Sequence, residues 1–165
     1  VQNGGISRYK KFEYLLTNIL QKPIKKQELS ELLSNFSKEV KQALLVCEVA
    51  TDIKELRDKT RNTKWLIVSG GDQAELREVF KQRNLDGYFD GGIFGSPDDK
   101  DTILKNEMDT LNITGRCLFL GDSMYDYQAA ITAQMNFVFI SQWTEVVDWE
   151  DKFTNNTRPN LSSLL

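Results

Sequence analysis

Histidine does not occur among the 165 residues of this sequence. Its absence excludes Ser-His-Asp and Cys-His catalysis, zinc sites with histidine ligands, and any histidine general base. Catalysis by this chain would therefore depend on carboxylates, lysine, serine or threonine, with or without the help of a hard metal ion.

Cysteines and long apolar runs are also scarce. The two cysteines, Cys47 and Cys117, both lie in apolar stretches, which favours reduced, buried thiols over a disulfide framework. The sequence has no apolar run that approaches the roughly 20 residues needed to cross a bilayer. These features predict a cytoplasmic protein that does not bind membranes.

The charged residues are nearly balanced, with 21 Lys and Arg against 24 Asp and Glu, for a net charge of −3. This balance argues against a nucleic-acid-binding protein, which usually has a strong basic excess. The balance hides an asymmetry: residues 1–64 hold 13 basic and 8 acidic residues, whereas residues 65–165 hold 8 and 16. The asymmetry indicates either two units with different tasks or two solvated surfaces.

The first 60 residues predict helices only. Ser7 can cap a helix whose apolar stripe runs from Phe12 to Leu20. A second helix is expected over residues 27–35, a third after a cap at Ser37, and a fourth after a cap at Thr51. We expect residues 1–60 to form a helical unit.

The apolar pattern changes after residue 60. Short apolar runs alternate with amphipathic stretches, which is typical of a parallel, doubly wound α/β sheet. Asp72 is expected to cap a helix, with Glu75 completing a capping box. Residues 61–165 thus predict an α/β core. Its expected strands are Trp65–Val68, Gly92–Gly95 (a weak strand), Cys117–Leu120 and Asn136–Ile140.

Polar residues follow three of these strands, where open α/β sheets bind ligands. They are Ser69, Lys100 and Asp122, and Asp126 lies one helical turn after Asp122. Taken singly, each has an ordinary structural interpretation as a turn, a solvated residue or a helix cap. Together, a hydroxyl and an ammonium can hold phosphoryl oxygens, and paired carboxylates can hold Mg²⁺.

This combination resembles the haloacid dehalogenase-like hydrolase superfamily, and most closely its phosphoglycolate-phosphatase-like members. The second family motif, a strand ending in Ser or Thr, matches the run Trp65–Gly71. The third, a Lys after a Gly-Ser-Pro turn, matches Gly95–Pro97 with Lys100. The fourth, an apolar strand followed by G-D-x-x-x-D, matches Leu118–Asp126. The resemblance implies a Rossmannoid parallel sheet with helices on both faces and an N-terminal helical cap.

The first family motif, an apolar strand followed by D-x-D-G-T, has no match in this sequence. Its first Asp is the family's nucleophile and its second is the general acid/base. We expect roughly 40–50 residues, including the central first strand, to be absent from the N-terminus. The flanking strands would then expose unpaired edges. The gap would be rearranged, filled by a neighbouring chain through self-association, or filled by something outside this sequence.

The resemblance implies that the intact protein cleaves a small phosphorylated metabolite with Mg²⁺ through an aspartyl-phosphate. Ser69, Gly70 and Lys100 would bind the phosphoryl group. Asp122 would hold the metal ion, and Asp126 would orient its water shell or Lys100. Arg8 is a candidate substrate contact, whereas the neighbouring Lys10 and Lys11 fit a solvated helix face better.

Several alternatives remain open at this stage. The chain alone is expected to be inactive, because it lacks the nucleophile. It can also be interpreted as a non-catalytic module that binds a phosphorylated ligand or a protein. Within the family, a phosphosugar mutase or a dehalogenase is an alternative, although the lysine and the G-D-x-x-x-D pattern favour phosphoryl chemistry.

Overall fold

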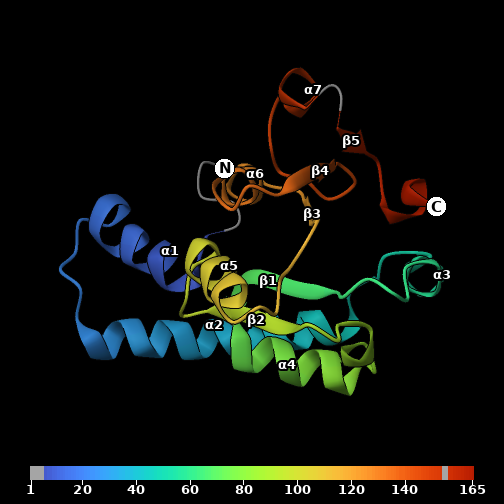
Figure 1. Ribbon diagram of the computed structural model, residues 1–165. Coiled ribbons are helices and arrows are strands. Elements are labelled where there is room, and N and C mark those ends of the chain that lie inside the picture. The colour runs from blue at the N-terminus through green and yellow to red at the C-terminus, as the bar shows by residue number, and fades with distance from the viewer. Residues whose placement is uncertain (1–5, 154–155) are drawn as a thin grey trace.

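The computed structural model describes residues 6–153 and 156–165, and its strands form two parallel sheets (Figure 1). In the first sheet, β1 (Leu66–Asp72) pairs with β2 (Gly92–Ser96). In the second, β3 (Leu118–Gly121) pairs with β4 (Asn136–Ile140), which pairs with the short strand β5 (Thr157–Arg158). The predicted α/β class with parallel strands is confirmed.

Helices cover both faces of the first sheet. Helix α4 (Gln73–Gln82) and helix α5 (Lys100–Asp109) both pack on β1 and β2, and Figure 1 shows them on opposite sides of the sheet. Helix α6 (Met124–Thr132) packs on β3 and β4 and contacts α5. This is the layering expected of a doubly wound sheet.

A small aromatic core holds the C-terminal part together. Phe139 is completely buried, and its ring stacks on that of Phe153 at a centroid distance of 4.3 Å. Phe137 and Ala130 complete the buried cluster, which helix α7 (Trp149–Lys152) helps to cover. Burying aromatic rings of this size supplies several kcal/mol each, about 25 cal/mol per Å².

The first helix is shorter than predicted. Helix α1 (Arg8–Tyr14) begins after the predicted cap Ser7, whose Oγ accepts a hydrogen bond from the backbone N–H of Tyr9. It passes into a π-helical segment, η1 (Leu15–Ile19). The wider turn shifts the apolar stripe, so that Leu16 is buried but Ile19 is 62% exposed. The predicted continuous stripe is therefore wrong beyond Leu16.

Residues 26–46 form one helix where two were predicted. Helix α2 (Lys26–Val46) runs through Ser37 without a break, since this stretch contains neither proline nor glycine. The Ser37 hydroxyl instead accepts a hydrogen bond from Arg8. Helix α3 (Ile53–Lys59) begins after Asp52, one residue later than predicted, and packs against the C-terminal 3-10 helix η3 (Leu161–Leu164).

Arg8 and Glu75 form a buried ion pair that joins α1 to the start of α4. Their side chains are both 8% exposed, and the guanidinium donates to the two carboxylate oxygens at 2.9 and 3.0 Å. Asp72 caps α4 as predicted, through the backbone N–H of Glu75. The predicted capping box is wrong, because the Glu75 side chain is turned toward Arg8. The Arg8 Nε atom is buried without a partner.

Among the described residues, the two sheets are not hydrogen-bonded to each other, and strands β1 and β3 are less buried than β2 and β4. Within the part of the chain that the structure describes, β1 pairs only with β2, and β3 only with β4. No residue of β1 or β3 is fully buried, whereas β2 and β4 each hold three buried residues. Strands inside a parallel sheet are normally the most buried. The inverted pattern marks β1 and β3 as open edges.

Across residues 6–153 and 156–165, no helix combines the length and the apolar character that a membrane span requires.

The Arg8–Glu75 pair predicts a strong coupling between the two side chains. Replacing Glu75 by Gln leaves a buried guanidinium without its charge partner and should lower the free energy of unfolding by about 3 kcal/mol. The double variant Arg8→Met/Glu75→Leu should be less destabilised than the sum of the two single variants. Urea unfolding measures both quantities. Glu55→Gln, in the exposed pair with Lys59, is the control and should change stability by less than about 0.5 kcal/mol. Additive effects at Arg8 and Glu75 would contradict the coupling.

Candidate functional site

The carboxyl end of β1 forms a loop-like, irregular strand segment. The strand was expected to end at Val68, but it continues to Asp72 with a shift in register between these two residues. The Ser69 hydroxyl oxygen accepts a hydrogen bond from the backbone N–H of Gly71 at 3.1 Å. The segment therefore presents a hydroxyl and a backbone turn where the sequence predicted a phosphate-binding serine.

The carboxyl ends of β1 and β2 are tied to each other. The Ser96 hydroxyl donates to the carbonyl oxygen of Gly70 at 2.8 Å, and Ser96 is 1% exposed. Glycine is required at position 95, because a Cβ atom there would lie 2.4 Å from the Gly71 carbonyl oxygen. The Gly-Ser turn thus brings the segment that leads to Lys100 against the Ser69–Gly71 segment.

Lys100 and Asp126 form a second buried ion pair, which joins α5 to α6. Both residues are 5% exposed, and the Lys100 Nζ contacts Asp126 Oδ1. The other carboxylate oxygen, Oδ2, accepts hydrogen bonds from the Ser123 hydroxyl at 2.6 Å and from the Ser123 backbone N–H at 3.2 Å. The structure therefore brings together two residues that the sequence placed in one site, with the Asp126 carboxylate in contact with the Lys100 ammonium.

Asp122 lies directly after β3, next to this ion pair in the chain. The Asp122 residue is exposed, but surrounding protein atoms partly desolvate its carboxyl group. This desolvation raises the pKa of the carboxyl group, and the negative charge of Asp126 raises it further. Glycine is needed just before it, since a Cβ on Gly121 would lie 2.4 Å from the Asp126 Cβ. A carboxylate with a raised pKa is one that a nearby cation would stabilise.

The described residues fit only part of a magnesium site. Within the described ranges, no group of three or more acidic or cysteine side chains is arranged to hold a metal ion. Both oxygens of Asp126 are engaged by Lys100 and Ser123, which leaves Asp122 as the carboxylate with an open face. Mg²⁺ prefers six oxygen ligands, several of them water, with one or two carboxylates.

Arg8, the candidate substrate contact, is engaged by Glu75 and Ser37. The residues on either side of it also bind the carboxyl ends of the strands. Ser7 Oγ lies 2.9 Å from Ser96 Oγ, and the Tyr9 hydroxyl donates to Asp72 at 3.2 Å. Lys10 contacts Asp99 at 3.0 Å. The start of α1 is thus anchored over the carboxyl ends of β1 and β2.

Sequence reasoning missed Tyr125 and Ser123. The Tyr125 hydroxyl donates to Asp101 at 3.2 Å, and its ring lies 5.7 Å from the Lys100 ammonium. Burial and the nearby Asp101 charge raise the pKa of Tyr125 to about 12. Ser123 forms a capping box with Asp126. The Ser-x-x-Asp spacing was a visible signal for this box, whereas nothing local indicated the contact between Tyr125 and α5.

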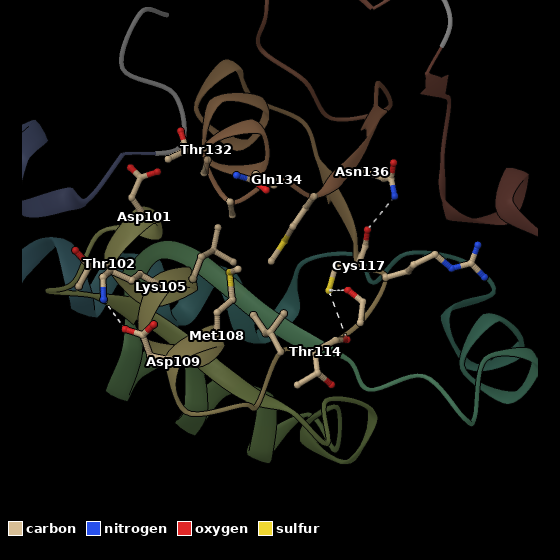
Figure 2. A pocket seen from close by; sticks show the side chains of 17 residues that line it. Asp101, Thr102, Lys105, Met108, Asp109, Thr114, Cys117, Thr132, Gln134 and Asn136 are labelled. Carbon is tan, nitrogen blue, oxygen red and sulfur yellow. Dashed lines mark hydrogen bonds and ion pairs between the residues drawn. The ribbon is translucent and has the colours of Figure 1, made fainter.

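A cavity of about 820 Å³ lies between α5 and the α6–β3 region, away from Ser69 (Figure 2). Figure 2 shows Met108 pointing from α5 into this space, with Gln134 and Cys117 on the opposite side. The apolar part of its lining consists mainly of Leu104, Met108, Ile113, Ala129 and Met135. The cavity lies between helices that pack on different sheets.

The chain matches a protein-family model and several solved structures. Residues 7–140 match the family model described as haloacid dehalogenase-like hydrolase. No curated protein gives a significant match. The similar solved structures include a HAD hydrolase of family IA, variant 3, from Entamoeba histolytica, with a TM-score of 0.73 and 15% identity over 94% of this chain and 79% of that one.

Two further structures have the same fold. A phosphonoacetaldehyde hydrolase-like protein from Oleispira antarctica has a TM-score of 0.65 and 15% identity, over 90% of this chain and 64% of that one. A HAD-superfamily hydrolase from Ehrlichia chaffeensis has a TM-score of 0.53 and 22% identity, over 94% of this chain and 71% of that one.

We expect Asp99, which lies just before Lys100, to make a pH-dependent contribution to the free energy of unfolding. Hydrogen bonds from Thr102, and then the contact with Lys10, lower its pKa from 3.8 to about 2. A lowered pKa means that the stabilisation is complete above pH 4 and is lost as the pH falls toward 2. Asp99→Ala, which also removes the N-cap of α5, should cost about 1 kcal/mol at pH 7.

The difference between wild type and Asp99→Ala should shrink as the pH falls from about 4 to about 2, measured by denaturant unfolding at each pH. Asp98→Ala, at the exposed neighbouring position, is the control and should behave like wild type. A difference that stays constant down to pH 2 would contradict this assignment.

Proposed function

The chain belongs to the haloacid dehalogenase-like hydrolases, and we propose that the intact protein is a Mg²⁺-dependent phosphomonoesterase that acts through an aspartyl-phosphate. The observation that carries this proposal is the buried Lys100 ammonium, held by Asp126 beside the exposed Asp122. A fixed cation in a site with little water is the main requirement for stabilising a transferring phosphoryl group. The substrate is a small phosphorylated metabolite of the cytoplasm.

The residues of this chain have separate roles in the proposed reaction. Ser69 and the backbone around Gly70 bind phosphoryl oxygens, and Lys100 neutralises their charge. Asp126 does not take part in bond making, because its two oxygens hold Lys100 and Ser123. Its role is to hold the ammonium beside the phosphoryl group, which lowers the cost of reorganising the site during the reaction.

Asp122 would hold the Mg²⁺ ion together with carboxylates from outside the 165 residues. When bound, the ion would supply positive charge to the phosphoryl oxygens. The exposure of Asp122 supports this role, since both oxygens of Asp126 are already engaged by Lys100 and Ser123.

The nucleophile, in this proposal, comes from a strand outside the 165 residues that lies between β1 and β3 and ends in D-x-D-G-T. Two observations support this position. The facing edges of β1 and β3 lack strand partners in the described residues, and they carry apolar side chains without the lysines or prolines that usually protect an edge. The 820 Å³ cavity, with its apolar floor, offers space for inward-pointing side chains of such a strand.

The 165-residue chain alone should not hydrolyse p-nitrophenyl phosphate in the presence of Mg²⁺, because it lacks the attacking aspartate. The chain extended by the residues encoded upstream of Val1 should show turnover, followed as absorbance of nitrophenolate. Lys100→Met should lower that turnover by a factor of about 100 or more. Lys81→Met, at an exposed position of α4 that does not line the cavity, is the control and should leave it unchanged.

Turnover by the 165-residue chain that Asp122→Ala abolishes would refute the proposed inactivity. An upstream sequence without D-x-D-G-T would refute the phosphatase and favour a non-catalytic module.

The open edges predict that the 165-residue chain associates with itself. At about 100 µM it should form dimers or larger species, measured by light scattering after size exclusion, because unpaired strand edges favour pairing between chains. Leu118→Lys, at a position of β3 that is 55% exposed, should shift the chain toward monomer. Leu111→Lys, at a 74% exposed position outside the strands, should not. A wild-type chain that stays monomeric would contradict the prediction.

A further inference from the structure

Two neighbouring residues of α5 contact two neighbouring residues of α6 in reverse order. Lys100 pairs with Asp126, and Asp101 accepts a hydrogen bond from the Tyr125 hydroxyl at 3.2 Å. The two contacts join the first turns of the two helices. Because α5 packs on the first sheet and α6 on the second, this double contact lies where the two sheets are joined.

The ring of Tyr125 also borders the lysine itself. The Lys100 Nζ lies 5.7 Å from the ring centroid, within the range of a cation–π interaction. Lys100 is 5% exposed, and its charged end therefore has two neighbours that limit its position, the Asp126 carboxylate and the Tyr125 ring. A lysine side chain is a four-carbon chain with several rotatable bonds, so a single ion pair does not restrict it to one conformation.

The partner carboxylate is fixed from its own helix. Ser123 donates to Asp126 from both its hydroxyl and its backbone N–H. Lys100 has no such support from α5, since the neighbouring cap residue Asp99 is engaged by Thr102 and Lys10. The Tyr125–Asp101 hydrogen bond is a second contact between the start of α5 and the start of α6, beside the Lys100–Asp126 pair.

We propose that Tyr125 is a positioning residue for Lys100. Its hydroxyl, held by Asp101, sets the distance between the first turns of α5 and α6, and its ring limits the space that the ammonium can occupy. The inference rests on the proposed function only in that the positioned ammonium serves to bind a phosphoryl group. The position of Lys100 can be observed without any catalysis.

The experiment follows the side-chain signals of lysines by NMR in the 165-residue chain labelled with ¹³C,¹⁵N-lysine, and then titrates inorganic phosphate. In the wild type, the Lys100 signal should be displaced by the Tyr125 ring current, and phosphate should shift it further. Tyr125→Leu should abolish the ring-current displacement. Tyr125→Phe should keep most of the displacement but weaken phosphate binding about fivefold, the equivalent of one hydrogen bond.

Asp101 supplies the rescue comparison. Asp101→Ala should behave like Tyr125→Phe, whereas Asp101→Asn should behave like wild type, because an amide oxygen can still accept the bond from the Tyr125 hydroxyl. Tyr127→Phe is the matched control on the same helix, since the Tyr127 ring packs on Phe137 and Phe153 rather than on Lys100. It should leave the Lys100 signal unchanged.

A Lys100 signal that is the same in wild type and Tyr125→Leu would overturn the proposal. So would Asp101→Asn and Asp101→Ala variants with equal effects. If the wild-type chain does not bind phosphate but the Lys100 signal still responds to Tyr125→Leu, positioning is supported, and the phosphoryl-binding role proposed for Ser69, Gly70 and Lys100 fails. The two inferences can therefore fail separately.

Discussion

The buried ion pair between Lys100 and Asp126 is the contact on which the arrangement of this molecule depends. The first sheet, β1–β2, and the second, β3–β4–β5, share no hydrogen-bonded strands in the described residues. Their carboxyl ends meet through this pair, which is almost fully shielded from water. A charge pair in such a place is useful only if both partners stay together, because a single buried charge is strongly unfavourable. The pair therefore ties the geometry of the candidate site to the relative position of the two sheets.

Glycine and serine residues make this close approach between chain segments feasible. Gly121 lets Asp126 lie against the end of β3, and Gly95 lets β2 lie against the Gly71 carbonyl. Ser123 and Ser96 then satisfy polar groups that would otherwise be buried without partners. Some residues of the family motifs are therefore needed for close packing of the backbone. Part of the pattern G-D-S-x-x-D exists because a Cβ atom in place of the glycine hydrogen would collide with the second aspartate.

Much of the fold was predictable from the sequence, because it depends on local patterns. The four longer strands and the caps at Ser7 and Asp72 follow from apolar runs and from residues that satisfy helix ends. The features that sequence reasoning missed depend on distant contacts. Ser37 was expected to cap a helix, but its hydroxyl serves Arg8, 29 positions away. Glu75 was expected to complete a capping box, but Arg8 offers it a charged, bidentate partner. The two cysteines were expected to be buried, but Cys47 is exposed and Cys117 is half-buried.

The anchoring of residues 7–10 over the carboxyl ends of β1 and β2 also has a consequence for handling the protein. Anything fused ahead of Ile6 enters the molecule at the edge that carries Ser69 and Lys100. The other terminus leaves from η3, which packs on α3 just before the amino end of β1. An affinity tag or fluorescent reporter attached after Leu165 therefore lies on the side away from the candidate site, whereas a segment that joins the chain at Ile6 lies beside it.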